Sequence, residues 1–404
     1  MRLIRNNGRM PGLDQTAVRR VNTGVVLRAL ADADADVTLQ ELVSATGLSR
    51  RTIELILGEL AADGWVALAV PTVSGGAGRP AKRFRFESRR LVVAAVVLDS
   101  HSAVAVIADL RGGELARAAV ALPDESRDPA LTVALASDAV RRALAEAGVA
   151  PERLAAGTVA AGGVIDARGV VGRLVNAPLW SGFALAAAFE QALGIPFAAE
   201  NDANLAALAE HWAGASIGRP DSAWLILGHR TGAGFLLGGE IHRGPRGTAG
   251  ELVESRVLNL HGVPDEAIRS LTSPIEADRR RAREAVVAAA AGDPRAVSDA
   301  RAFAEQIADV IDVLTWTIAP ETVVLGGGLE VGAGVLVPLV SEFLRDRGTP
   351  EVELVATRLG GEAPLVGAIR RALVDVDSWL YSAPGAQPPR SSEPSRDEPR
   401  ELRR

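Results

Sequence analysis

The sequence contains no cysteine among its 404 residues, which excludes disulfides, thiolate catalysis and zinc sites built from cysteine. Lysine occurs once, at Lys82, so the basic residues are almost all arginine. No uninterrupted apolar run approaches the roughly 20 residues that a membrane-spanning helix needs, and the first residues lack the apolar segment of a signal peptide. We therefore expect a cytoplasmic protein that does not associate with a membrane.

Length and charge both point to more than one domain. A chain of 404 residues exceeds the range of about 50–250 residues that one domain usually occupies. The net charge is −6, yet residues 1–90 carry fourteen basic and nine acidic residues, which leaves −11 for residues 91–404. A basic segment in an acidic chain favours nucleic acid as the partner of that segment, although a solvated arginine-rich surface would have the same composition.

The spacing of apolar residues in the first part of the chain predicts three helices, near residues 14–31, 39–46 and 49–62. Thr38 and Glu41 have the spacing of a capping box at the start of the second helix. Gly47 then ends that helix, and Ser49 is expected to cap the third. Two short helices joined by a glycine-containing turn are typical of a helix-turn-helix.

The third predicted helix has one buried and one exposed face. Its core stripe comprises Ile53, Ile56, Leu57 and Leu60. Its outward residues are Arg50, Arg51, Glu54 and Leu55. Two extended stretches follow, at 65–70 and 82–86, and they flank a glycine-rich loop, as in a wing. The sequence therefore predicts a winged helix-turn-helix domain over residues 14–88.

In a helix-turn-helix the first turn of the second helix meets base edges and phosphates in the major groove. Four residues with suitable chemistry occupy that turn, because arginine can bond guanine twice and hydroxyls can bond phosphate: Ser49, Arg50, Arg51 and Thr52. The wing adds Arg79, Lys82, Arg83 and Arg85, and an arginine in Gly-Arg-Pro can reach a narrow minor groove. We expect double-stranded DNA as the partner, the alternative being a helical hairpin with ordinary surface arginines.

From Leu91 onward, strand-forming runs alternate with helical patterns, which predicts an α/β domain over residues 91–378. The candidate strands are 92–99, 103–109, 117–122, 154–161, 222–227, 232–239 and 322–326. The segments 92–115 and 222–241 resemble each other, which indicates a faint internal duplication and two lobes with a cleft for a ligand. Residues 383–404 lack apolar periodicity and are predicted to form a disordered tail.

Polar and glycine clusters interrupt the α/β pattern at Asn176, at 200–204 and at 247–251. Carboxylates and amides suit a polyhydroxylated ligand, because each hydroxyl both donates and accepts hydrogen bonds. Asp202 has the chemistry of a general base for phosphoryl transfer. Alternatively, Asp202 caps a helix at 203–213.

Residues 17–378 resemble the ROK-family regulators, in which a winged helix-turn-helix precedes a domain related to sugar kinases. The resemblance rests on four segments: Asn176-Ala-Pro-Leu-Trp180, Glu200 to Trp212, His242 to Leu252 and Pro320 to Leu329. It implies a two-lobed actin-like ATPase (ribonuclease H-like) fold and a homodimer or homotetramer. It also implies that four residues face a sugar or sugar derivative: Asn176, Asn201, Asp202 and Glu251.

Three departures from the family pattern affect the expected chemistry. The first phosphate loop reads Asp99-Ser-His-Ser-Ala103 and lacks both glycines, and Arg230 replaces a glycine of the second loop. Glycines there let backbone N–H groups approach phosphates. In the family, a zinc site is formed by three cysteines and a histidine. This chain has no cysteine, and Glu254 stands where that histidine is expected. The sequence thus predicts no metal, no cofactor and no enzymatic activity, with Asp202 a vestigial base.

The sequence predicts a DNA-binding repressor of carbohydrate-related genes whose ROK-like domain binds a sugar effector. The enzyme alternative is an ATP-dependent sugar kinase with an accessory N-terminal domain. A third alternative is an assembly module without ligand or DNA function.

Overall fold

The structure is a computed structural model of the chain, and it describes residues 15–69, 82–123, 128–173, 177–258, 260 and 267–381. These residues divide into two compact units. The N-terminal unit holds the described residues up to 92 together with 109–113 and 374–381, and the second unit holds 93–108 and the described residues of 114–373. The tail predicted at 383–404 lies outside the described residues.

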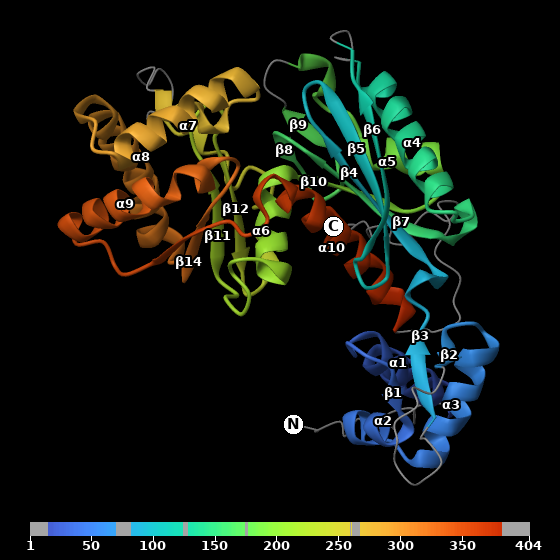
Figure 1. The fold of residues 1–404 in the computed structure, drawn as a ribbon. Coiled ribbons are helices and arrows are strands. Elements are labelled where there is room, and N and C mark those ends of the chain that lie inside the picture. The colour runs from blue at the N-terminus through green and yellow to red at the C-terminus, as the bar shows by residue number, and fades with distance from the viewer. Residues whose placement is uncertain are drawn as a thin grey trace, which may run out of the picture. The chain divides into compact units, whose positions relative to one another are not determined.

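The N-terminal unit contains three helices at the predicted positions, drawn in blue in Figure 1: α1 (Gln15–Ala31), α2 (Leu39–Thr46) and α3 (Arg50–Ala62). An antiparallel sheet of order β1-β3-β2 joins them. Its strands are β1 (Val37–Thr38), β2 (Val66–Leu68) and β3 (Arg83–Phe86). Residues 70–81, between β2 and β3, lie outside the described residues.

The predicted caps of α2 and α3 are confirmed. The backbone N–H of Glu41 donates to Thr38 Oγ1 at 3.2 Å, and the Glu41 carboxylate accepts from the Thr38 N–H at 2.6 Å, which completes a capping box. Gly47 ends α2 in the left-handed conformation, with φ +68°. The Ser49 hydroxyl accepts from the Thr52 N–H at 3.1 Å and starts α3. Local polar chemistry therefore sets the turn between the two helices.

The core of the N-terminal unit contains the predicted stripe of α3, which is buried. Leu27 and Leu30 of α1 and Leu42 of α2 are buried as well. Trp65 stacks on Phe86 with 6.5 Å between ring centroids. The end of α10 (Ala363–Leu380) also belongs to this unit. There the Arg28 guanidinium lies 3.9 Å from the centre of the Tyr381 ring and 3.2 Å from the Asp377 carboxylate.

The second unit is built on two five-stranded sheets (Figure 1). The first has the order β10-β7-β4-β5-β6, with β4 (Val92–Leu98), β5 (Ser102–Asp109), β6 (Glu114–Ala121), β7 (Leu154–Ala161) and β10 (Phe197–Asn201). The second has the order β13-β12-β11-β14-β15, with β11 (Ser222–Ile226), β12 (Gly232–Leu237), β13 (Glu240–Ile241), β14 (Thr322–Leu325) and β15 (Glu353–Ala356). If the strands of each sheet are numbered along the chain, the first sheet read from β10 and the second read from β15 both have the order fifth, fourth, first, second, third. The predicted duplication is therefore confirmed in the topology.

Helices and short turns complete this α/β unit. The remaining helices are α4 (Pro129–Glu146), α5 (Leu185–Leu193), α6 (Asp202–Ala213), α7 (Glu276–Ala290), α8 (Pro294–Ile318) and α9 (Ala333–Arg347). A hairpin is formed by β8 (Val164–Ile165) and β9 (Val171–Arg173). Short 3-10 turns lie at Ser88–Arg90, Pro151–Arg153, Pro178–Trp180, Leu252–Glu254, Ala267–Thr272, Leu329–Gly332 and Gly360–Glu362.

The passage from β10 into α6 connects the two sheets. β10 pairs with β7 of the first sheet. α6 begins at the next residue and packs on the second sheet, where its alanines Ala203, Ala206 and Ala207 contact a cluster that includes Trp224 and Leu236. The chain therefore moves from one sheet to the other at the Asn201–Asp202 peptide, with no linker between them.

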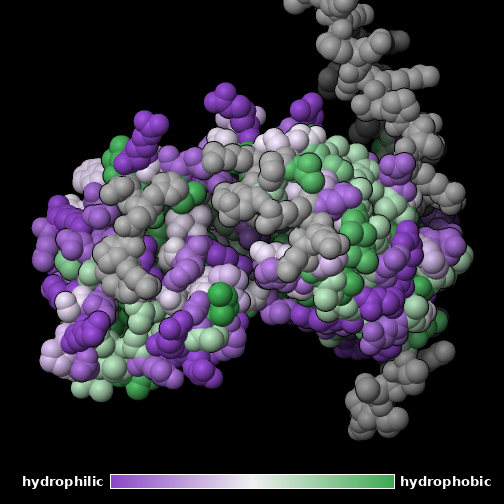
Figure 2. All heavy atoms as spheres, turned by 90° about the horizontal axis from the view of Figure 1, so that it is seen from above, coloured by the Kyte–Doolittle hydropathy of each residue, from purple (hydrophilic) through white to green (hydrophobic). Residues whose placement is uncertain are grey.

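The face of the molecule seen in Figure 2 is largely hydrophilic, with hydrophobic residues in small groups. Among the described residues, no helix is long and apolar enough to cross a membrane.

The capping box gives a first prediction. Thr38→Ala removes the hydroxyl that accepts from Glu41, which should cost about 1 kcal/mol of helix stability. Amide hydrogens of α2 should then exchange about fivefold faster in native-state hydrogen exchange. Thr38→Ser keeps the hydroxyl, so the amide hydrogens of α2 in this variant should exchange at the rate of the parent protein. Equal rates in all three proteins would mean that the cap contributes nothing.

Candidate functional site

The first turn of α3 brings the four predicted DNA-contact residues together. Ser49 and Thr52 share a hydrogen bond between their hydroxyls, at 2.8 Å. Arg50 is exposed and donates from Nε to Glu54 at 3.1 Å. Arg51 is also exposed and makes no hydrogen bond or ion pair within the described part of the chain. Arg51 therefore offers all its guanidinium donors outward.

The predicted wing residues divide into two groups. Lys82 is exposed directly before β3, whereas Arg79 lies outside the described residues. Arg85 is held by Asp36 through two hydrogen bonds of 2.9 and 3.0 Å, and Arg83 donates to the Asp36 carbonyl at 2.5 Å. The hydrogen bond from Arg85 lowers the pKa of Asp36, although partial burial opposes this effect. Arg83 and Arg85 thus fasten β3 to the residues before β1.

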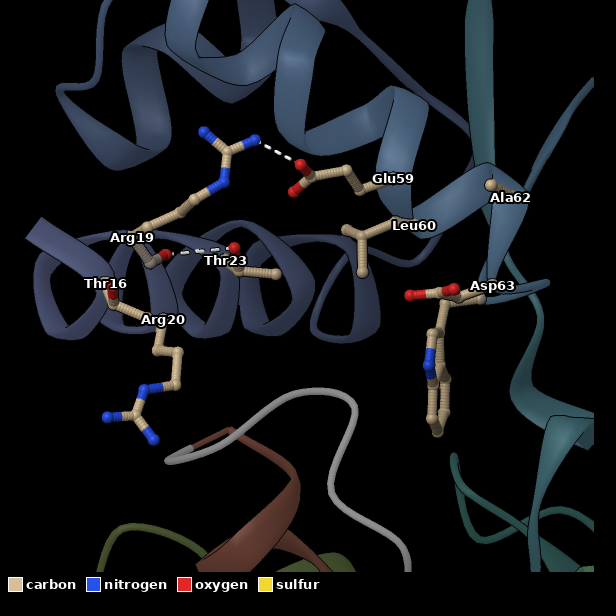
Figure 3. A pocket seen from close by; sticks show the side chains of 9 residues that line it. Thr16, Arg19, Arg20, Thr23, Glu59, Leu60, Ala62 and Asp63 are labelled. Atoms are coloured by element: carbon tan, nitrogen blue, oxygen red, sulfur yellow. Dashed lines mark hydrogen bonds and ion pairs between the residues drawn. The ribbon is translucent and has the colours of Figure 1, made fainter.

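Two cavities lie in the N-terminal unit. One of about 300 Å³ lies between α1 and the end of α3, where Arg19 pairs with Glu59 (Figure 3). None of the predicted DNA contacts lines it. The other, of about 630 Å³, is bordered by Arg50 and Lys82 and has apolar walls that include Leu57, Leu68 and Phe84.

In the second unit a buried carboxylate organises the predicted sugar-site segments. Glu200 is 2% exposed. It accepts from the Asn204 side chain at 2.8 Å and from the Asn201 N–H at 3.0 Å, and it pairs with Arg243. The pair joins residues 200–204 to the loop that follows β13. The sequence analysis did not identify this pair, although the adjacent polar segments contained both residues.

Asn201 caps α6. Its side-chain oxygen accepts from the N–H groups of Ala203 at 2.9 Å and Asn204 at 3.1 Å, and its side-chain nitrogen donates to the Gly163 carbonyl at 3.0 Å. The interpretation of Asp202 as the cap was therefore wrong, because Asp202 is the first residue of the helix and Asn201 precedes it. The Asn201 amide nitrogen carries a second N–H besides the one bonded to Gly163, so the predicted ligand contact of Asn201 need not break these bonds.

Asp202 is partly buried, and its carboxylate accepts from the Ala203 N–H at 2.8 Å. Loss of water around the carboxylate raises the pKa of Asp202. The charge of Arg230 and the Ala203 N–H oppose this shift, and the charge of Asp99 adds to it. Asp99, Asp202 and Arg230 therefore share one electrostatic environment, and a carboxylate with a raised pKa suits a proton acceptor.

Two glycines permit the close packing around this environment. A Cβ on Gly234 would lie 2.0 Å from the Ala203 carbonyl oxygen, so β12 can approach the start of α6 only without a side chain. Gly247 has φ +72°, and its Cβ would lie 2.1 Å from the Ile165 carbonyl oxygen. The loop that carries Gly247 is thereby held against the β8–β9 hairpin.

The other predicted sugar-site residues are only partly placed. Glu251 is partly buried and precedes the turn Leu252–Glu254, while Asn176 lies outside the described residues. Arg230, in the second loop, donates from its backbone N–H to the Thr272 hydroxyl at 3.2 Å and has an exposed side chain. The described residues contain no group of three or more histidine, aspartate or glutamate side chains that could hold a metal ion.

Comparisons with known proteins connect this unit to sugar kinases and to a regulator. The bifunctional enzyme NanE/NanK of Brucella melitensis is 32% identical over 188 residues, which are 44% of this chain and 35% of that enzyme; the chain thus spans about a third of that relative. The ROK hexokinase of Thermus thermophilus is 32% identical, with a TM-score of 0.56 over 71% of this chain and all of the hexokinase. A ROK-family transcriptional regulator, described as a homolog of the E. coli MLC protein, has a TM-score of 0.69 at 20% identity over 91% of this chain and 99% of its own.

The prediction that the chain is not an enzyme was wrong. Besides the hexokinase, its relatives include proteins named glucokinase and N-acetyl-D-glucosamine kinase, so the altered phosphate loops do not exclude kinase activity. The exposed side chain of Arg230 provides a physical reason. A residue that replaces a loop glycine need not fill the loop when much of its side chain is exposed.

The raised pKa of Asp202 gives a second prediction. A carboxylate with a raised folded-state pKa disfavours folding once pH exceeds its ordinary value of 3.8. Asp202→Asn should therefore raise the Tm at pH 7, and the gain should shrink as pH falls toward 3.8. Scanning calorimetry across this pH range measures the effect.

Asp166→Asn is the matched control, with the opposite sign. Burial alone would raise the pKa of Asp166, but hydrogen bonds from Val170 and Arg168 outweigh it and lower the pKa. Its carboxylate thus stabilises the fold above the ordinary pKa, and this stability is lost as pH falls. Asp166→Asn should lower the Tm at pH 7. A pH-independent gain for Asp202→Asn would rule out the electrostatic explanation.

The family model confirms the resemblance seen in the sequence. The model described as "ROK family" matches residues 94–253 and 263–374, more than half of the chain. The protein therefore belongs to the ROK family, and its second unit has the α/β fold of that family.

Proposed function

We propose that this protein is a DNA-binding transcriptional regulator, with a winged helix-turn-helix over residues 14–88 and a ROK domain over 91–378 that senses a sugar. The observation that carries the proposal is the capped pair α2 and α3, joined by a left-handed glycine and followed by a two-stranded hairpin. In such a motif the second helix enters the major groove.

The exposed side of α3 supports this function. Ser49, Arg50, Arg51 and Thr52 lie together in its first turn, where groove contacts are made. Arg51 would bond a guanine or a phosphate, and Arg50 would bond a phosphate through its terminal guanidinium nitrogens while its Nε–H stays on Glu54. Lys82 and Arg79 would contact the backbone or minor groove from the wing.

The coverage of the regulator structure gives further support. The alignment with the regulator structure leaves out only 9% of this chain. Most of residues 1–93, which precede the segment matched by the ROK family, must therefore be aligned with the regulator. At 20% identity this likeness concerns the fold, and the function is our inference from it together with the chemistry of α3.

For the ROK domain we propose a sugar or sugar derivative as effector, contacted by Asn176, Asn201, Asp202 and Glu251. The kinase names of the relatives favour a sugar as the ligand class. We also propose that the protein represses carbohydrate-related genes, forms a homodimer or homotetramer, and is located in the cytoplasm.

The regulator hypothesis predicts that Arg51→Ala weakens operator binding by about 1–3 kcal/mol, the loss of a bidentate guanine contact. The operator is first selected by genomic DNA enrichment with the purified protein, and fluorescence anisotropy then gives the Kd. Arg168→Ala removes an exposed arginine of the second unit and should leave the Kd unchanged. Failure to enrich any sequence would refute DNA binding.

Sugar phosphorylation is the second candidate function, favoured by Asp202 and by the kinase relatives. A general base contributes about 10²–10⁴-fold to a rate. If the protein is a kinase, ADP release with ATP, magnesium and a hexose panel should be sugar-dependent and should fall by such a factor in Asp202→Asn. Absence of sugar-dependent release over the whole panel would remove this candidate.

A further inference from the structure

Helix α3 presents a large apolar side chain to solvent. Leu55 is 53% exposed, whereas the other large apolar residues of the helix are at most 3% exposed: Ile53, Ile56, Leu57 and Leu60. With about 100° per residue, Leu55 lies about 150° around the helix from the centre of that buried stripe. The core of the N-terminal unit therefore does not explain a leucine at this position.

The residues around Leu55 form a narrow, smooth strip. Arg51 precedes it by one turn, and Gly58 and Ala62 follow on the same side of the helix. A Cβ at Gly58 would meet nothing within 4 Å. An extended partner such as a DNA groove can approach this strip without meeting bulky side chains.

Both acidic residues that flank the strip are paired within the unit. Glu54 accepts from Arg50 at 3.1 Å, and Glu59 is paired with Arg19 of α1. Paired carboxylates repel phosphates less than free ones, because each charge is partly neutralised by its partner. The strip therefore presents the leucine and the outward guanidinium of Arg51 to a polyanion.

We propose that Leu55 contacts the 5-methyl group of a thymine in the major groove, beside the base pair that Arg51 contacts. This inference rests on the proposed DNA-binding function. The thymine methyl group is the apolar feature that base pairs offer in the major groove, and apolar side chains are its usual partners. One helical turn rises about 5.4 Å and base pairs are about 3.4 Å apart, so this thymine lies one or two base pairs from the Arg51 contact.

Removal of single thymine methyl groups from the DNA tests the contact. Each thymine of the enriched operator is replaced in turn by deoxyuridine, which lacks only the methyl group, and the Kd of the full chain is measured by fluorescence anisotropy. Burying one methyl group is worth about 0.8 kcal/mol, so at least one position should weaken binding about fourfold. That methyl dependence should vanish in Leu55→Ala and persist in Arg51→Ala.

Val21→Ala is the matched control, because Val21 is similarly exposed at 56% but lies on α1; it should keep the fourfold dependence. An operator that binds with no methyl dependence, or a dependence that survives Leu55→Ala, overturns the inference and leaves the regulator function standing. No enriched operator at all overturns both. Amide exchange of α3 in Leu55→Ala should match the parent, which separates a lost contact from a lost fold.

Discussion

The buried carboxylate of Glu200 is the interaction on which the predicted sugar-site region of the second unit depends. A charge with 2% exposure is tolerated only with partners, and here these are Arg243, the Asn204 amide and a backbone N–H. Loss of one partner of a buried pair typically costs about 3–5 kcal/mol, because the other charge remains buried. Residues 200–204 and the loop leading to Glu251 are therefore stabilised as one assembly.

The electrostatics of the neighbouring residues follow from this arrangement. Asn201 supplies the cap of α6, which leaves Asp202 at the first helical position, where its carboxylate accepts from the Ala203 N–H. Burial and the nearby Asp99 raise its pKa, and Arg230 moderates the shift. A carboxylate whose pKa is raised by folding destabilises the domain above its ordinary pKa, and such costs are typical of functional positions. In the proposed function, Asp202 would contact a hydroxyl of the sugar, whether that sugar is only bound or also phosphorylated.

Features with local signals were predictable from the sequence. The bounds of α2, the capping box at Thr38 and Glu41, and the buried stripe of α3 follow from residue type and spacing alone. β10 and β15 were not predicted, because each is a short strand whose partner is distant in sequence and whose composition does not favour strands strongly. β6 begins at Glu114, three residues before the prediction, because pairing with β5 extends it through a bulge.

The candidate site was harder to predict for related reasons. The choice between Asn201 and Asp202 as helix cap depends on one residue of register, and the Glu200–Arg243 pair joins residues 43 apart. The four predicted DNA-contact residues lie in a single turn, so their proximity was predictable, whereas the hydrogen bonds between Arg85 and Asp36 were not. The conclusion against enzymatic activity was wrong because missing glycines alone do not reveal where the replacing side chains point.

The direct passage from β10 into α6 has a mechanical consequence. The chain passes from β10 into α6 at one peptide, so rotation of one sheet against the other would act on the backbone torsions of Asn201 and Asp202. The Asn201 side chain holds those torsions through its bonds to the first turn of α6 and to Gly163. A ligand that displaced either bond would loosen this joint, so in the proposed function sugar binding at Asn201 and rotation of the sheets would depend on the same few hydrogen bonds.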